Sequence, residues 1–278
     1  MKATYLLMTT LQKYAADLPG RHGSVDWGLS VRRDGIEIAS INPDRVFQTA
    51  SIGKVFLLIA ASTAIVSGQR SRLDPIQLQA ADIVGDSGIW RFMTERTLSL
   101  ESVCILIASV SDNCATNALV SELTLPVVQA QSQELGIDDT RMLDRIRDVR
   151  TGADPIGPSQ SKAGDLSQLM YQLGMDRDTG NKYSLVSEWL SLNTDLSMVS
   201  SAFNFDPLAH NELTEGGKFF NKTGTDVGVQ AEAGCYVKDQ TVWTYSMIAN
   251  WSDQNPNVPM EVKNDMNAFG RLLASMIM

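Results

Sequence analysis

Ser51 and Lys54, three positions apart in this 278-residue sequence, have residue types and a spacing suited to nucleophilic chemistry. Residues three apart share a helical face, so the serine hydroxyl and the lysine amine can meet. The start of a helix favours negative charge on the serine oxygen, and burial lowers the pKa of an amine until it can take the serine proton. The pattern alone is weak, because S-x-x-K is expected about 0.7 times by chance in such a chain.

A second motif, Ser111-Asp112-Asn113, follows the apolar run that ends at Val110. It offers a hydroxyl to relay protons, a carboxylate to brace the backbone and an amide to bind a substrate amide. Read alone, the same three residue types are those favoured at a helix N-cap.

A third motif, Lys222-Thr223-Gly224-Thr225, is predicted at the end of a strand. Its ammonium and two hydroxyls can bind a carboxylate, and its glycine allows the substrate to come close. An isolated match of this kind would be an ordinary polar strand end. Because S-D-N and K-T-G are each expected only about 0.03 to 0.05 times, all three motifs together have a chance rate on the order of one in a thousand.

In this order the three motifs resemble those of class A β-lactamases and penicillin-binding proteins. Three further segments are similar to the family, and the resemblance covers the chain from about residue 10 to the end. They are the glycine-rich Gly85-Asp86-Ser87-Gly88-Ile89, the helix from Leu98 that enters the S-D-N loop, and Leu143-Asp144-Arg145, which resembles the start of the family's omega loop.

The resemblance implies an α+β fold of the β-lactamase/transpeptidase type, with an antiparallel sheet flanked by helices and an all-helical lobe. We expect one domain over residues 1–278, with an α/β lobe from about 1–50 and 205–278 and a helical lobe of about 51–204. The resemblance also implies a role for each motif residue. Ser51 would be the acylated nucleophile, Lys54 its general base and Ser111 the proton shuttle. Asn113 would hold an amide of the substrate, and its carboxylate would be bound by the K-T-G-T segment, through Lys222, Thr223 and Thr225 with Gly224 between them. The backbone N–H groups of Ser51 and Thr225 would form the oxyanion hole.

The sequence departs from the family where class A enzymes carry the glutamate that activates the deacylating water. Arg147 stands at that position, and an arginine cannot act as a base. The nearest carboxylates are Asp148 and Asp154. Three alternatives follow for deacylation. Asp148 or Asp154 substitutes for the glutamate as the base, Lys54 is the base in both acylation and deacylation, or the acyl-enzyme persists as in penicillin-binding proteins.

Three functions therefore stay open. The first is a β-lactamase-type serine hydrolase that opens a β-lactam, or a related amide or ester, through a Ser51 acyl-enzyme. The second is a penicillin-binding or sensing protein with a long-lived acyl-enzyme. The third is an intracellular esterase, amidase or acyltransferase that acts on a non-antibiotic substrate.

Residue patterns predict the elements that must position these motifs. An amphipathic helix is expected over the first 18 residues, a buried helix from about Ser51 to Ser67, and a long ordered loop over 144–161. Further helices are expected at Leu100–Ser109, Ala115–Leu123, Leu166–Gly174, Leu185–Leu192 and Pro259–Met278. Strands are expected at Val25–Arg32, Glu37–Ile41, Lys218–Thr223, Gly228–Val237 and Val242–Asn250, so the first and last thirds of the chain must pair into one antiparallel sheet.

Net charge and cysteine content limit the kinds of molecule that this protein is expected to bind. The net charge of −9 argues against binding to nucleic acid or to anionic membranes, and we expect a monomer that acts on a small molecule with a carboxylate and an amide. Cys104, Cys114 and Cys235 have no metal-ligand spacing; buried free thiols are favoured over a disulfide or a reactive cysteine, and no metal or cofactor is expected. No secretory signal is recognisable, which suggests a cytoplasmic protein, or a periplasmic or secreted one whose signal has been removed.

Overall fold

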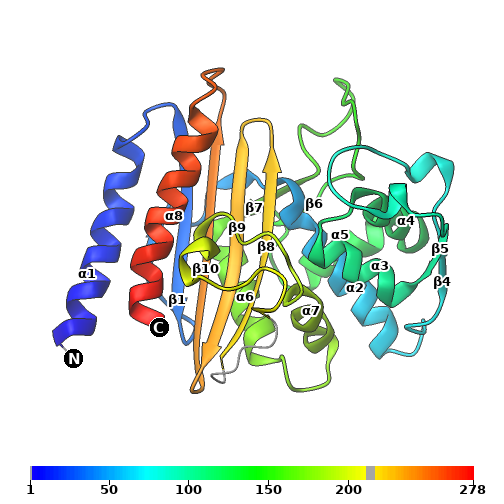
Figure 1. Ribbon diagram of the computed structural model, residues 1–278, viewed down its shortest axis with the longest axis horizontal. Coiled ribbons are helices and arrows are strands. Elements are labelled where there is room, and N and C mark those ends of the chain that lie inside the picture. Colours follow the sequence, from blue (N-terminus) through cyan, green and yellow to red (C-terminus); the bar gives the residue numbers. More distant parts are fainter. Residues whose placement is uncertain (1, 211–216) are drawn as a thin grey trace.

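The computed structural model describes residues 2–210 and 217–278. Its centre is a five-stranded antiparallel sheet in the order β2-β1-β10-β9-β8 (Figure 1). The strands are β1 (Val25–Arg33), β2 (Ile36–Ile41), β8 (Lys218–Asp226), β9 (Val229–Lys238) and β10 (Thr241–Trp251). The pairing of β1 with β10 joins the first and last thirds of the chain, which confirms that prediction and the α+β fold class.

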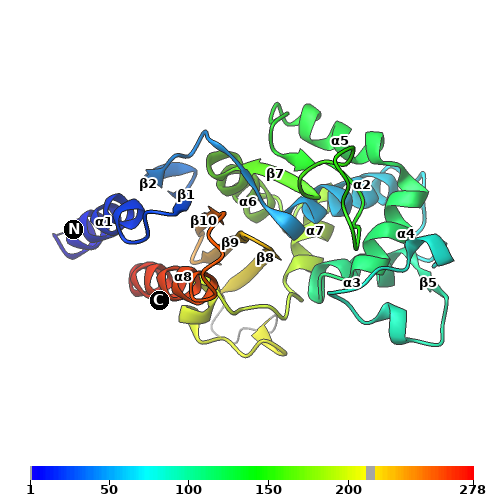
Figure 2. The ribbon, with the colours of Figure 1, turned by 90° about the horizontal axis from the view of Figure 1, so that it is seen from above.

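Helices cover both faces of this sheet (Figure 2). The terminal helices α1 (Lys2–Asp17) and α8 (Val258–Ile277) lie together on one face, and α6 (Ala163–Met175) lies on the other. Nine of the ten residues of β9 are buried, so this strand is enclosed on both sides. Two hydrophobic clusters result, one on each face of the sheet.

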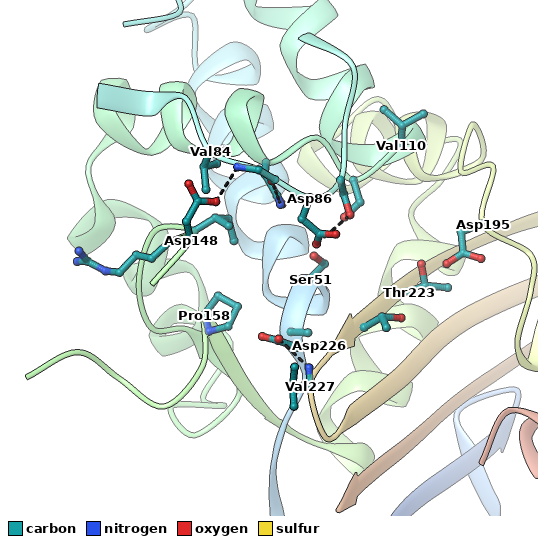
Figure 3. A pocket seen from close by; sticks show the side chains of 18 of the residues that line it. Ser51, Val84, Asp86, Val110, Asp148, Pro158, Asp195, Thr223, Asp226 and Val227 are labelled. Carbon is teal, nitrogen blue, oxygen red and sulfur yellow. Dashed lines mark hydrogen bonds between the residues drawn. The ribbon is translucent and has the colours of Figure 1, made fainter. Parts of the chain in front are cut away.

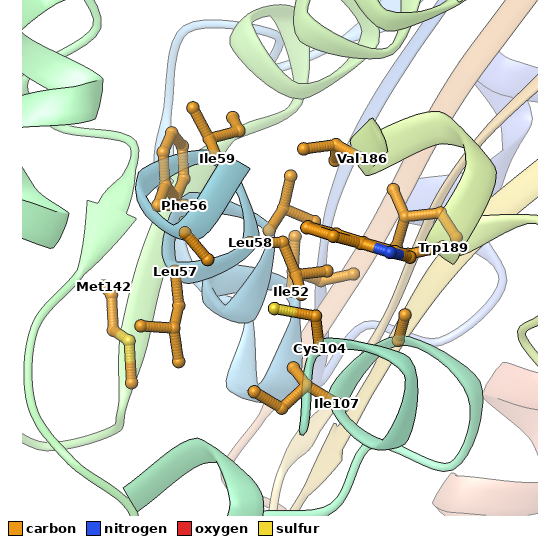
Figure 4. Packing of buried hydrophobic residues seen from close by; sticks show 14 of the residues in the cluster. Ile52, Phe56, Leu57, Leu58, Ile59, Cys104, Ile107, Met142, Val186 and Trp189 are labelled. Carbon is orange, nitrogen blue, oxygen red and sulfur yellow. The ribbon is translucent and has the colours of Figure 1, made fainter. Parts of the chain in front are cut away.

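Beside the sheet, α2 (Lys54–Val66) is surrounded by other helices, as its apolar sequence predicts. Figure 4 shows its side chains Phe56, Leu57, Leu58 and Ile59 packed with residues of neighbouring elements, and all four are fully buried. The other helices of this part are α3 (Leu100–Ser109), α4 (Asn113–Leu123), α5 (Leu125–Glu134) and α7 (Lys182–Leu190). The position of α2 at the centre of the core holds the residues at its start in place.

Several short elements were not predicted from the sequence. They are α5 and the strands β3 (Val46–Gln48), β4 (Pro75–Gln77), β5 (Thr97–Ser99), β6 (Arg141–Met142) and β7 (Ser159–Lys162). Two to four residues carry too little periodicity to identify a strand. The small sheet β3-β7-β6 matters for the site, because β3 leads to Ser51 and the loop 143–158 connects β6 to β7. The predicted loop therefore ends earlier than expected, where β7 begins.

Two motif segments also differ from their predicted local structure. Ser51 lies on a 3₁₀-helix, Ala50–Gly53, and α2 begins only at Lys54. The tighter 3₁₀ turn brings residues three apart onto one side, so Ser51 and Lys54 still face the same region. The K-T-G motif lies inside β8, which continues to Asp226 instead of ending at Thr223.

The three cysteines, Cys104, Cys114 and Cys235, are free and buried, which confirms the favoured interpretation. Within the described residues no helix is both long and apolar enough to cross a bilayer.

Replacing Leu58 by alanine tests the central position of α2. Leu58 is fully buried, so Leu58→Ala should leave a cavity and lower the free energy of unfolding by about 2–5 kcal/mol, measured by urea denaturation. The control Leu73→Ala, at a side chain that is 79% exposed, should change stability by less than about 0.5 kcal/mol. Equal losses in both variants would contradict a core organised around α2.

Candidate active site

All three sequence motifs meet at one cleft of about 630 Å³ (Figure 3). Its walls come from the 3₁₀-helix before α2, the α3–α4 connection, the loop 143–158 and strand β8. Seven of the predicted site residues line it: Ser51, Ser111, Asn113, Arg147, Asp148, Thr223 and Thr225. The structure thus brings together groups that lie more than 170 positions apart in the sequence.

Ser51 is held at the cleft by strained backbone. Ala50, directly before it, has φ +49°, in the left-handed region that costs a residue with a Cβ about 1–3 kcal/mol. The Ala50 carbonyl accepts a hydrogen bond from Ser159 Oγ at 2.7 Å, which helps to fix this turn. Among the described residues the Ser51 hydroxyl has no hydrogen-bond partner, so it is free to meet a substrate carbonyl.

Lys54 is buried beneath the cleft with only 1% of its surface exposed. Its Nζ donates to the Ser111 carbonyl at 2.6 Å, to Ser111 Oγ at 3.1 Å and to Asn113 Oδ1 at 2.7 Å. No hydrogen bond joins it to Ser51 in the part of the chain that the structure describes. Burial, reinforced by repulsion from Lys222, holds the pKa of Lys54 well below its ordinary value against the opposing effect of Asp112 and Asp86.

Ser111 connects the two buried amines. Its φ is +54°, and this backbone turn directs its carbonyl to Lys54 while its hydroxyl lies 3.1 Å from the Nζ atoms of both Lys54 and Lys222. Lys222 also donates to the Thr223 carbonyl at 2.9 Å. Burial lowers the pKa of Lys222 to about 8, with Asp195 acting in the opposite direction. One hydroxyl between two amines is suited to passing a proton.

Asp112 and Asn113 fix this connection in place. Asp112 accepts from the backbone N–H groups of Ile89 and Trp90 with one oxygen and from that of Ala115 with the other, so it both braces the backbone and caps α4. Asn113 accepts from Lys54 and donates to the Gly85 carbonyl at 3.0 Å. Its amide nitrogen carries a second hydrogen that can serve a substrate.

Strand β8 is the edge of the large sheet, and its open edge lies along the cleft. Gly224 is required there by the protein itself: a Cβ at this position would lie 2.2 Å from the Thr49 carbonyl oxygen and 3.1 Å from Ser51 N. This close approach explains the glycine better than the predicted approach of a substrate. Thr223 is 4% exposed and Thr225 is exposed, and both line the cleft.

The loop 143–158 is held by an ion-pair cluster. Arg147 donates to Asp144 through Nε at 2.6 Å, and Arg150 pairs with the same carboxylate at 3.1 Å. Burial opposes ionisation of Asp144, but these guanidinium groups outweigh it and keep the pKa of this carboxyl below its ordinary value. Arg147 also lies 3.3 Å from Asp154.

The two carboxylates considered for deacylation lie in different places. Asp148 lines the cleft, and its Oδ1 accepts from Gly85 N at 2.7 Å (Figure 3). Asp154 is bound to Thr151 and Arg147 and is not among the cleft residues. The geometry therefore favours Asp148 over Asp154 as a base near the cleft, while either role stays a prediction.

Three acidic residues of the cleft were not singled out from the sequence: Asp86, Asp195 and Asp226. Asp86 belongs to the glycine-rich segment and points toward Ser51 in Figure 3. Asp226 directly follows the K-T-G-T motif, so its proximity to that motif was the available signal. Over the described ranges, no group of three or more His, Cys, Asp or Glu side chains is arranged to hold a metal ion.

The fold and these motifs define a serine hydrolase of the β-lactamase type. A family model described as β-lactamase enzyme family matches residues 7–269, and the chain belongs to that family. Solved structures with a similar fold include a β-lactamase from Sphaerobacter thermophilus, with a TM-score of 0.79 and 21% identity over 95% of this chain and 98% of that one. PBP-A aligns with a TM-score of 0.79 and 19% identity over 97% and 96%. No curated protein sequence matches the chain.

Removing Asp144 tests the ion-pair cluster of the loop. Asp144→Ala leaves Arg147 and Arg150 without their shared partner, so we expect trypsin to cleave within residues 143–158 roughly tenfold faster. The control Asp26→Ala removes an aspartate whose pair with Arg45 is half exposed, and cleavage of the loop should not change. Unchanged cleavage in Asp144→Ala would show that the loop is held by other contacts.

Proposed function

We propose that this protein opens a β-lactam, or a related amide or ester, by forming an acyl-enzyme at Ser51. The observation that carries the proposal is the arrangement around Ser111, whose hydroxyl lies 3.1 Å from two buried amines at the floor of the cleft that contains Ser51. Buried, hydrogen-bonded amines with lowered pKa values are typical of catalytic sites.

In the proposed acylation, neutral Lys54 takes the proton of Ser51, directly or through Ser111, and Ser51 Oγ attacks the substrate carbonyl. The bond from the carbonyl carbon to the leaving nitrogen then breaks. Ser111 delivers a proton to that nitrogen and takes a proton back from Lys54. The Lys54 amine is therefore neutral again at the end of acylation. The charged Lys222, with Thr223 and Thr225, holds the substrate carboxylate.

A second candidate is a long-lived acyl-enzyme, and the ion pairs of Arg147 favour it. Arg147 occupies the position expected for the deacylation base and is bound to Asp144 and Asp154. A glutamate at position 147 would face both of those carboxylates, so Arg147→Glu is not expected to restore a base. One solved structure with a similar fold is an acyl-enzyme complex of a PBP-A mutant with penicillin G.

Time-resolved intact mass after addition of benzylpenicillin tests both candidates. We expect a mass increase equal to the whole penicillin, and Ser51→Ala should reduce its formation about a thousandfold or more. The control Ser275→Ala removes a hydroxyl that bonds only to its own helix and should keep the adduct. A shift that persists for hours supports the long-lived acyl-enzyme, and a rapid return to the free mass supports hydrolysis.

Absence of an adduct in the wild-type protein would overturn acylation at Ser51, provided that nitrocefin is not turned over either. An adduct that survives in Ser51→Ala would place the nucleophile elsewhere.

The pH dependence of acylation tests the charge of Lys222. Because the pKa of Lys222 is about 8 and its charged form binds the carboxylate, we expect acylation to slow as the pH rises above about 8. Lys54 must be neutral, and its lowered pKa keeps it so on the alkaline side. The arginine in Lys222→Arg stays charged at alkaline pH, so the pH at which its acylation rate falls should be more than one unit higher than in the wild-type protein.

The control for this profile is Lys218→Arg, at the exposed start of the same strand, which should leave the decline where it is. A wild-type rate that stays constant from pH 7 to 10 would show that the charge of Lys222 is not needed.

A further inference from the structure

The positions of residues along strand β8 determine which way a bound substrate lies in the cleft. Lys222, Gly224 and Asp226 share one face of the strand, and Lys222 and Asp226 lie about 13 Å apart at 3.3 Å per residue. Ser51 N lies against Gly224, midway between them. A substrate whose carboxylate binds at Lys222 and whose carbonyl is attacked by Ser51 must extend its acyl half toward Asp226.

The cleft carries carboxylates that are not in ion pairs. Asp86, Asp148 and Asp226 line the cleft, and none of them forms an ion pair with a lysine, arginine or histidine of the described residues. Asp148 and Asp226 each use Oδ1 to accept one backbone N–H at 2.7 Å, which leaves the other oxygen available.

The cations nearby are already engaged. Arg147 and Arg150, which also line the cleft, are paired with Asp144 and Asp154. Arg91 donates to the backbone carbonyl of Asp86 and lies over the ring of Phe92, and it keeps its positive charge. Three carboxylates, Asp86, Asp148 and Asp226, therefore face one guanidinium that has no carboxylate partner among the described residues, which leaves a net negative charge in this part of the cleft.

Two observations independent of these carboxylates favour a ligand in the cleft. Thr223 is 4% exposed, lines the cleft, and its hydroxyl has no hydrogen-bond partner within the described part of the chain. The cleft also continues past Asp226 into a second cavity of about 560 Å³, which Asp148 and Asp226 line as well. There is room at this end for an acyl group that extends beyond the reacting carbonyl.

Building on the proposed function, we propose that the acyl half of the substrate carries a positive charge, such as an ammonium group, that binds between Asp226 and Asp86. Figure 3 shows Asp86 and Asp226 on opposite sides of Ser51, so the two carboxylates belong to opposing walls of the cleft. The carboxylate of the substrate would then bind at one end of β8 and its cation at the other. A complementary dipole of this kind sets the orientation of the substrate.

Three penicillins with the same phenylacetyl frame test this proposal at pH 6. Benzylpenicillin is neutral at the α-carbon, ampicillin carries an ammonium there and carbenicillin a carboxylate. We expect acylation rates, followed by intact mass, to fall by about fivefold at each step from ammonium to neutral to carboxylate. Added 0.5 M NaCl should narrow the differences, because exposed charges are screened.

The double variant Asp86→Asn/Asp226→Asn should bring the three rates within about twofold of one another, since asparagine keeps the backbone hydrogen bond of Asp226 and removes only the charges. The matched control Asp206→Asn, at an aspartate with the same kind of backbone contact away from the cleft, should keep the wild-type order.

Each result decides a different point. Equal rates for the three penicillins in the wild-type protein, or a reversed order, would overturn the inference and leave acylation at Ser51 standing. A wild-type order that persists in the double variant would show that these aspartates do not recognise the cation. No adduct with any of the three would overturn the proposed function together with the inference.

Discussion

The buried amine of Lys54 is the constraint on which the rest of the site depends. An amine that is 1% exposed loses nearly all of its contact with water, so its hydrogen bonds must come from the protein. They come from Ser111 and Asn113, almost sixty residues further along the chain. The packing of α2 against the α3–α4 connection is therefore a condition of the proposed chemistry as well as of the fold. The second amine, Lys222, extends the same condition to the large sheet through Ser111.

Local strain at the site is a consequence of this convergence. Ala50 and Ser111 both have φ in the left-handed region, at +49° and +54°, although neither is glycine. The first turn presents Ser51 to the cleft, and the second directs the Ser111 carbonyl to the buried Lys54 amine. Conformations that cost about 1–3 kcal/mol persist only where surrounding contacts determine them. Here those contacts are the Ser159 bond to Ala50 and the Asp112 bonds to the neighbouring backbone.

Sequence patterns predicted the long elements well and selected three motifs that meet at one cleft, and they failed where tertiary contacts decide the local structure. The sheet pairing of β1 with β10 and the buried α2 followed from strong hydrophobic patterns over many residues. The 3₁₀ turn at Ser51 and the role of Gly224 could not be predicted, because both depend on the close approach of β8 to that turn. The ion pairs of Arg147 with Asp144 and Asp154 could not be predicted either. The sequence shows which residues are close along the chain, but it does not show which of them come into contact when the loop folds.

The groups proposed for acylation and those considered for deacylation lie in different parts of this molecule. The former come from the packed core and the sheet edge, whose geometry is fixed by many contacts. The carboxylates considered for deacylation lie on the loop 143–158, where Arg147, at the position at which the resemblance leads us to expect a base, pairs with Asp144 and Asp154. These contacts give position 147 a structural role in the loop. Of the carboxylates that line the cleft without an ion pair, Asp148 is the candidate base, and Asp86 and Asp226 are the proposed partners for a cation on the substrate.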